Sequence, residues 1–186
     1  MSLINRRVLL TSALATLAAP PLLAATQPYQ IPSHHRAKIV NTKAGFRPGE
    51  IHLDPGNFAL YWILPEQKAV RYIVGIGVEG RYYPGTYRIA RKVEWPRWTP
   101  TKNMIRREPE IYAKLAAGMA GGPENPLGSR ALYLYQGSRD SLLRIHGTPR
   151  PQSIGVRVSN GCIRMINAQV QDLYERAPNG TRVVLH

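Results

Sequence analysis

The chain has 186 residues, a formal net charge of +14, sixteen glycines, sixteen prolines and one cysteine. This length suits a single domain with a hydrophobic core. The many glycines and prolines argue against a helical bundle and favour short strands joined by turns and loops. A single cysteine, Cys162, excludes an internal disulfide.

Residues 1–25 have the pattern of an export signal. Arg6 and Arg7 precede an alanine-rich apolar run that two prolines interrupt. A basic start, a short apolar centre and a small-residue end are typical of a signal peptide, and the interruption disfavours a stable membrane span. The arginine pair fits the twin-arginine route as well as the general secretory route. We therefore expect a periplasmic protein without a transmembrane segment in its mature form.

The mature protein would keep a net charge of +12, because residues 1–25 contain two basic and no acidic residues. A strongly basic protein concentrates at polyanions. For an exported protein these are wall polymers and membrane surfaces, so we expect no nucleic-acid partner. The charge is equally compatible with a role in solubility alone.

The rest of the sequence predicts a mainly β fold. Residues 26–48 are polar and contain prolines, which indicates an N-terminal arm before a domain at 49–186. Apolar residues at period two, bounded by turn residues, predict strands. These strands cover 51–54, 58–64, 69–78, 86–93, 131–135, 142–145 and 181–185. Helical spacing predicts helices over 108–117 and 168–177, the second capped by Asn167 and ended by Pro178.

The segment 94–130 is long and irregular, with Trp95 and Trp98 beside prolines. Irregular segments of this length in compact domains commonly form lids or binding loops. A solvated insertion carrying a short helix is the alternative. The two tryptophans favour a lid that faces a substrate.

The chemistry concentrates in two short motifs, Ile145-His146-Gly147-Thr148 and Ser159-Asn160-Gly161-Cys162-Ile163-Arg164. Gly161 allows a tight turn that gathers backbone amides beside the thiol, which is the requirement for an oxyanion site. Arg164, together with the dipoles of a helix opening after Cys162, would favour the thiolate. His146, at a strand end, is the type of base that activates a cysteine nucleophile. Each residue alone is more often structural, but together they indicate a Cys–His pair.

The other histidines do not form a metal pattern. His34 and His35 are adjacent, His52 lies in a predicted strand, and His186 is the last residue of the sequence. With one cysteine and no His-x-x-x-His or Cys-x-x-Cys spacing, a zinc site is not expected. Gly75-Ile-Gly77 lies in a strand without a following helix, so we expect no nucleotide cofactor.

His-Gly-Thr followed by Ser-x-Gly-Cys-Ile-Arg-Met resembles the active-site signature of the L,D-transpeptidases, the YkuD domain family. The resemblance extends over residues 49–186 and includes four further segments. They are Asp54-Pro-Gly-Asn57, Arg71–Gly77, Arg91–Pro100 and Gly121–Gly128. The Cys-containing signature with an upstream His-Gly is specific.

The resemblance implies a β-sandwich-like domain with one or two packed helices and a lid-like insertion. It implies that Cys162 attacks the diaminopimelate–D-Ala bond of a peptidoglycan stem and forms a thioester. Transfer to an amine on a second stem then gives a 3–3 crosslink. The resemblance further implies that His146 is the base and that the carbonyl of Gly147 orients it. It also implies that the oxyanion is held by amides near Ser159, Asn160, Gly161 and Cys162. Arg164 either binds a substrate carboxylate or shapes the loop.

Several alternatives stay open on the sequence. The acceptor of the acyl group could be water, giving an L,D-carboxypeptidase or amidase, or a lipoprotein lysine. A wall-binding module without activity is a further alternative, which the presence of both His146 and Cys162 disfavours. Many family members have a histidine where this chain has Asn160. We interpret that position as not essential, the alternative being a weakened or redirected transfer step.

Overall fold

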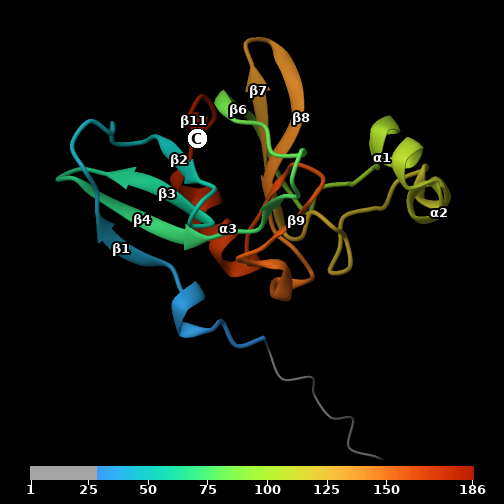
Figure 1. Ribbon diagram of the computed structural model, residues 1–186, viewed down its shortest axis with the longest axis horizontal. Coiled ribbons are helices and arrows are strands. Elements are labelled where there is room, and N and C mark those ends of the chain that lie inside the picture. The colour runs from blue at the N-terminus through green and yellow to red at the C-terminus, as the bar shows by residue number, and fades with distance from the viewer. Residues whose placement is uncertain (1–28) are drawn as a thin grey trace, which may run out of the picture.

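The computed structural model describes residues 29–186, so the predicted signal at 1–25 lies outside the described residues (Figure 1). A nine-stranded mixed sheet runs through this part of the chain, in the order β1-β4-β3-β2-β11-β6-β7-β8-β10. Its strands are β1 (Lys38–Asn41), β2 (Ile51–Asp54), β3 (Ala59–Leu64), β4 (Lys68–Ile73), β6 (Gly85–Glu94), β7 (Arg130–Gln136), β8 (Arg139–His146), β10 (Ile163–Arg164) and β11 (Arg182–Leu185). A small parallel pair joins β5 (Ile76–Gly77) to β9 (Arg157–Ser159).

The mainly β prediction is confirmed, and the sheet bends around a single apolar core. The buried side chains of β2, β3, β4, β6, β7, β8 and β11 belong to one contiguous cluster. The helix α3 (Asn167–Arg176) inserts Val170 and Leu173 into that cluster. It packs on β7 and β8, and its Asp172 accepts a 2.5 Å hydrogen bond from Tyr72 of β4. One helix therefore connects both halves of the sheet, which gives the fold its sandwich-like character (Figure 1).

The helices of the insertion differ from the predicted helix at 108–117. The segment contains α1 (Lys102–Arg107), α2 (Pro109–Tyr112) and a 3-10 turn at Ala113–Leu115. Pro109 disfavours helical geometry at Glu108 and so separates α1 from α2. The helix α1 was not predicted, although its N-cap is regular: Thr101 Oγ1 accepts a hydrogen bond from the amide of Met104 at 3.2 Å.

Two predictions about the sheet also need correction. The predicted strand 69–78 is divided into β4 and β5, because the chain leaves β4 at Val74 and Gly75 pairs instead with Arg164. The predicted arm supplies β1, which pairs antiparallel with β4 at the sheet edge. The short strands β9 and β10 were not predicted, since two or three residues are too few to show alternation.

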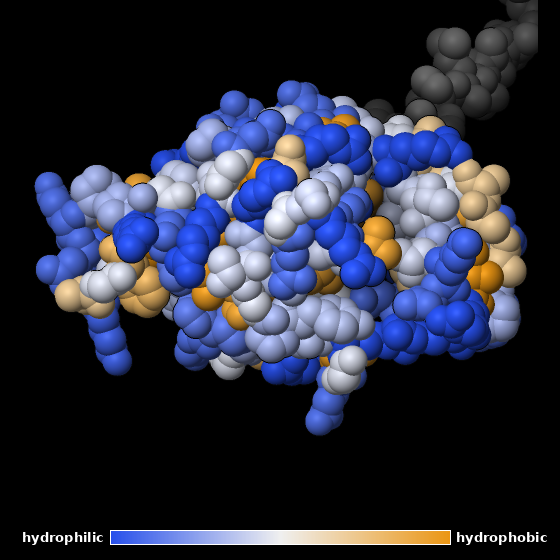
Figure 2. Space-filling model, turned by 90° about the horizontal axis from the view of Figure 1, so that it is seen from above, coloured by the Kyte–Doolittle hydropathy of each residue, from blue (hydrophilic) through white to orange (hydrophobic). Residues whose placement is uncertain are grey.

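The surface is mostly polar on the face shown in Figure 2, where apolar side chains form only small separate patches. Scattered apolar residues of this kind are ordinary for a soluble surface. Within residues 29–186, no helix has the length and apolarity needed to cross a membrane.

Candidate functional site

The motif residues gather on one face of the sheet, at the strands β7, β8 and β10. β10 pairs with β8 in parallel, with Arg164 opposite His146, and β8 pairs with β7 in antiparallel register, with His146 opposite Ala131. Residues opposite each other in a ladder point to the same face. Cys162 immediately precedes β10, and its Sγ contacts the carbonyl oxygen of Leu142 in β8 at 3.8 Å, so it lies beside the strand that ends in His146. The sheet thus brings the two predicted motifs together.

His146 is held as a neutral imidazole in one tautomer. Its side chain is buried, with 4% of its surface exposed, and Nδ1 lies 2.6 Å from the carbonyl oxygen of Gly147. Because a carbonyl only accepts, Nδ1 carries the proton and Nε2 is the free base. Burial, with a smaller contribution from the cations of Arg164 and Arg144, lowers the pKa of His146 to about 3. The imidazole is therefore uncharged at neutral pH.

Cys162 lies in a turn between β9 and β10 and is partly exposed. Its Sγ is 3.8 Å from the carbonyl oxygen of Leu142, a weak thiol donor contact. Leu142 has a positive φ of 63° and sits at a bulge in β8, which directs this carbonyl toward the thiol. Among residues 29–186 no hydrogen bond joins Sγ to His146, so proton transfer between them requires rotation of the thiol away from Leu142.

The predicted bias toward a thiolate is absent from this structure. Burial raises the pKa of Cys162 above its ordinary value, although the Arg144 backbone and the Arg144 and Arg164 cations act in the opposite direction. The predicted position of Cys162 at the start of α3 is wrong, because the strand β10 lies between the thiol and that helix. Burial thus favours the neutral form of both the thiol and the imidazole.

The turn before the thiol is shaped by Ser159 and Gly161. Ser159 Oγ donates to the carbonyl of Cys162 at 2.6 Å and accepts from the amide of Gly161 at 3.1 Å. Gly161 has φ of +124°, and a Cβ there would lie 2.9 Å from the ring of Tyr83. The amide of Gly161 is thus already engaged, which leaves the amides of Asn160 and Cys162 as the candidate donors to an oxyanion.

Asn160 connects this turn to the insertion. Its Nδ2 donates to the hydroxyl of Tyr112 in α2 at 3.2 Å, and its Oδ1 accepts from Arg81. Arg81 also forms a 3.1 Å ion pair with Glu108, between α1 and α2. Trp98 lies close to Tyr112, with ring centroids 6.3 Å apart. The insertion is therefore tied to the residue that precedes Gly161 and Cys162, through contacts that the sequence did not reveal.

Asn167, which was predicted to cap the second helix, instead supports the turn at His146 and Gly147. It is not the cap of α3, because Ile166 occupies that position without a side-chain hydrogen bond. Instead its Oδ1 accepts from the amide of Ser129 at 3.1 Å. A Cβ on Gly147 would lie 2.1 Å from that oxygen, and one on Gly128 would lie 2.3 Å from it. These glycines allow Asn167 to pack directly under the His146–Gly147 turn.

Arg164 neighbours both chemical groups. It is half-buried, and burial lowers the pKa of its guanidinium, which still stays cationic. Its buried Nε has no hydrogen-bond partner within residues 29–186. A buried unpaired donor is costly, which is the state expected of a group that awaits an anionic ligand.

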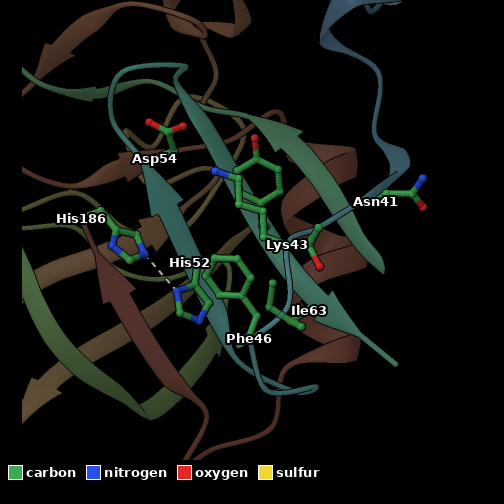
Figure 3. Close-up of a pocket in the computed structure, with 9 residues that line it drawn as sticks. Asn41, Lys43, Phe46, His52, Asp54, Ile63 and His186 are labelled. Carbon is green, nitrogen blue, oxygen red and sulfur yellow. Dashed lines mark hydrogen bonds between the residues drawn. The ribbon is translucent and has the colours of Figure 1, made fainter. Parts of the chain in front are cut away.

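A separate cavity of about 390 Å³ lies elsewhere in the sheet, at β2, β3 and β11 (Figure 3). In this cavity His52 Nδ1 is 3.0 Å from His186 Nε2, beside Phe46 and Tyr61. The cavity lining includes none of the motif residues. Residues 29–186 contain no group of three His, Cys, Asp or Glu side chains arranged to hold a metal ion.

Comparison with known proteins identifies the domain. The family model of the L,D-transpeptidase catalytic domain, YkuD, matches residues 48–185. The probable L,D-transpeptidase ErfK/SrfK of Escherichia coli K12 is 39% identical over 127 residues, which are 67% of this chain and 39% of that protein. The probable L,D-transpeptidase YbiS of the same strain is 40% identical over 112 residues, 59% of this chain and 35% of that protein. This chain thus matches well under half the length of these relatives.

Solved structures share the fold. A Brucella melitensis structure, titled as a probable carnitine operon oxidoreductase, is 48% identical with a TM-score of 0.57, covering 84% of this chain and 96% of that one. An L,D-transpeptidase from Mycobacterium smegmatis has a TM-score of 0.53 at 16% identity, covering 73% and 57%. The second likeness concerns the fold alone. Since the family model spans nearly all of residues 49–186, this chain belongs to the L,D-transpeptidase (YkuD) catalytic domain family.

Proposed function

We propose that this protein is a cysteine-dependent L,D-transpeptidase that acts on the tetrapeptide stems of peptidoglycan in the periplasm. The observation that carries the proposal is the arrangement of His146 and Cys162. The strand β10 begins directly after Cys162 and pairs with the end of β8 that carries His146, and the carbonyl of Gly147 leaves Nε2 of the imidazole free to accept a proton. Family membership supports the choice of substrate.

The first half-reaction cleaves the diaminopimelate–D-Ala amide. Cys162 gives its proton to Nε2 of His146, and the thiolate attacks the amide carbonyl. The amides of Asn160 and Cys162 are the donors available for the oxyanion, because the amide of Gly161 already donates to Ser159. When the carbon–nitrogen bond breaks, the imidazolium returns its proton to the departing amine, and a thioester remains on Cys162.

The second half-reaction transfers the acyl group to an amine on another stem. The amine attacks the thioester, His146 takes the amine proton, and the sulfur leaves and is protonated again. The product is a 3–3 crosslink. Arg164, with its unpaired Nε beside the site, is suited to bind a carboxylate of the stem.

The test is mass spectrometry of the protein incubated with disaccharide-tetrapeptide, beside the Cys162→Ala variant. A crosslinked dimer and free D-Ala that depend on Cys162 are expected. Tripeptide without dimer, again dependent on Cys162, would replace transpeptidation by hydrolysis. Absence of both product and acyl-enzyme from folded protein would refute the proposed substrate.

A further inference from the structure

A strip of aromatic and cationic side chains crosses the sheet and ends at Cys162. Arg91 of β6 lies opposite Tyr133 of β7, and Tyr133 lies opposite Arg144 of β8. The parallel register of β10 with β8, extended by one residue, places Cys162 level with Arg144. Neighbouring strands are about 4.8 Å apart, so the Arg144 side chain begins one strand away from the thiol.

Contacts hold both guanidinium groups in place. The guanidinium carbon of Arg91 is 3.8 Å from the centroid of the Tyr133 ring, and that of Arg144 is 4.1 Å from it. Their cover leaves the ring only 6% exposed. Arg144 is further fixed by a two-pronged ion pair with Asp140, at 2.7 Å and 2.8 Å. Such stacking and forked pairing fix the direction of a guanidinium in a way a lysine would not reproduce.

The charge around the thiol is positive. Arg144 and Arg164 act on Cys162, and the one carboxylate that also acts on it is Asp140. Arg91 makes no ion pair within 4.0 Å inside the part of the chain that the structure describes. Asp140 pairs with Arg144 and also interacts with the charge of Arg91, so this single carboxylate faces three cations, Arg91, Arg144 and Arg164. A negatively charged group would be favoured here.

We propose that Arg144, supported by Arg91 on Tyr133, forms a receptor for the free C-terminal carboxylate of the donor peptide, so that the site selects terminal over internal bonds. The inference rests on the proposed function. Backbone geometry puts this carboxylate carbon within about 4 Å of the attacked carbonyl carbon, which is within reach of a long side chain that begins on the strand next to Cys162. The incoming carboxylate binds the Arg144 guanidinium either beside Asp140 or in place of it.

The first experiment needs no peptide. The rate constants for alkylation of Cys162 by iodoacetate and by iodoacetamide are measured by mass spectrometry at low salt, and their ratio reports the charge that an anion meets near the thiol. Arg144→Gln is expected to lower this ratio about threefold to tenfold, and Arg91→Gln, on a strand further from Cys162, is expected to lower it by a smaller factor. The effect should shrink in about 0.5 M salt, because salt screens exposed charges.

Two further variants make the result specific. Arg88→Gln is the matched control, because Arg88 lies on the same strand as Arg91 and stacks on Tyr135, with its guanidinium carbon 5.8 Å from the ring centroid, further from Cys162. Its ratio should equal that of the unchanged protein. Asp140→Asn removes the opposing charge and should raise the ratio, which keeps the test decisive if Arg144→Gln does not fold. Equal ratios in Arg91→Gln, Asp140→Asn and the unchanged protein would overturn the proposal.

The second experiment compares tetrapeptides that end in a free carboxylate and in a carboxamide. The unchanged protein should have a lower KM for the peptide with the free carboxylate than for the carboxamide. Arg144→Gln should raise the KM for the carboxylate peptide at least fivefold while changing kcat little. Equal KM values for both peptides with the unchanged protein would refute the receptor. If no peptide reacts but the alkylation ratios follow the expected order, the substrate assignment fails and the anionic subsite stands.

Discussion

The burial of His146 as a neutral group makes a measurable prediction about acid stability. Its pKa is about 3 in the folded protein, against an ordinary value of 6.5. Between these pH values, His146 therefore binds a proton in the unfolded chain but not in the folded protein. The stabilising contribution is complete above pH 6.5 and is lost as pH falls toward 3. Between pH 7.5 and pH 4.5 the loss amounts to about 2–3 kcal/mol of unfolding free energy.

The assay is urea unfolding of the reduced protein at these two pH values. His146→Gln should remove about 2–3 kcal/mol from the pH dependence, whatever its effect on stability at pH 7.5. His34→Gln is the matched control, because His34 lies exposed in the first 3-10 turn. It should show the same pH dependence as the unchanged protein. If His146→Gln loses as much stability on acidification as the unchanged protein does, His146 is not the buried neutral group described here.

Three further predictions concern the same site. Alkylation of Cys162 by iodoacetamide should be slow at neutral pH and still rising at about pH 9, because burial raises the pKa of the thiol; a plateau below about pH 8 would contradict this. Gly147→Ala should cost about 2–4 kcal/mol in urea unfolding, since its Cβ would meet Asn167 Oδ1 at 2.1 Å, and Asn167→Ala in the same chain should recover part of that loss. Asn160→Ala should release α2 by removing the hydrogen bond to Tyr112, so that limited trypsin digestion within the insertion becomes about tenfold faster; an unchanged digestion rate would refute the tether.

Local patterns were sufficient for the strands of the central sheet and for α3. Alternation of apolar residues marks β2, β3, β6 and β7 because one or both faces of each strand are buried. The predicted helix at 108–117 overlaps α2, but α1 and the division of the insertion into short helices were not predicted, since their packing depends on contacts such as Trp98 with Tyr112 rather than on an amphipathic pattern. The edge strand β1 was missed for a similar reason: its side chains are mostly exposed.

The sequence by itself determined that His146, Gly147 and Cys162 are the chemical candidates, because their types and spacing carry that information. Only the tertiary structure decided their environment. The parallel pairing of β10 with β8 joins segments separated along the chain, and this pairing alone places Arg144 beside the thiol. Burial likewise depends on the complete fold, and it raises the pKa of the thiol where local charges had suggested a thiolate.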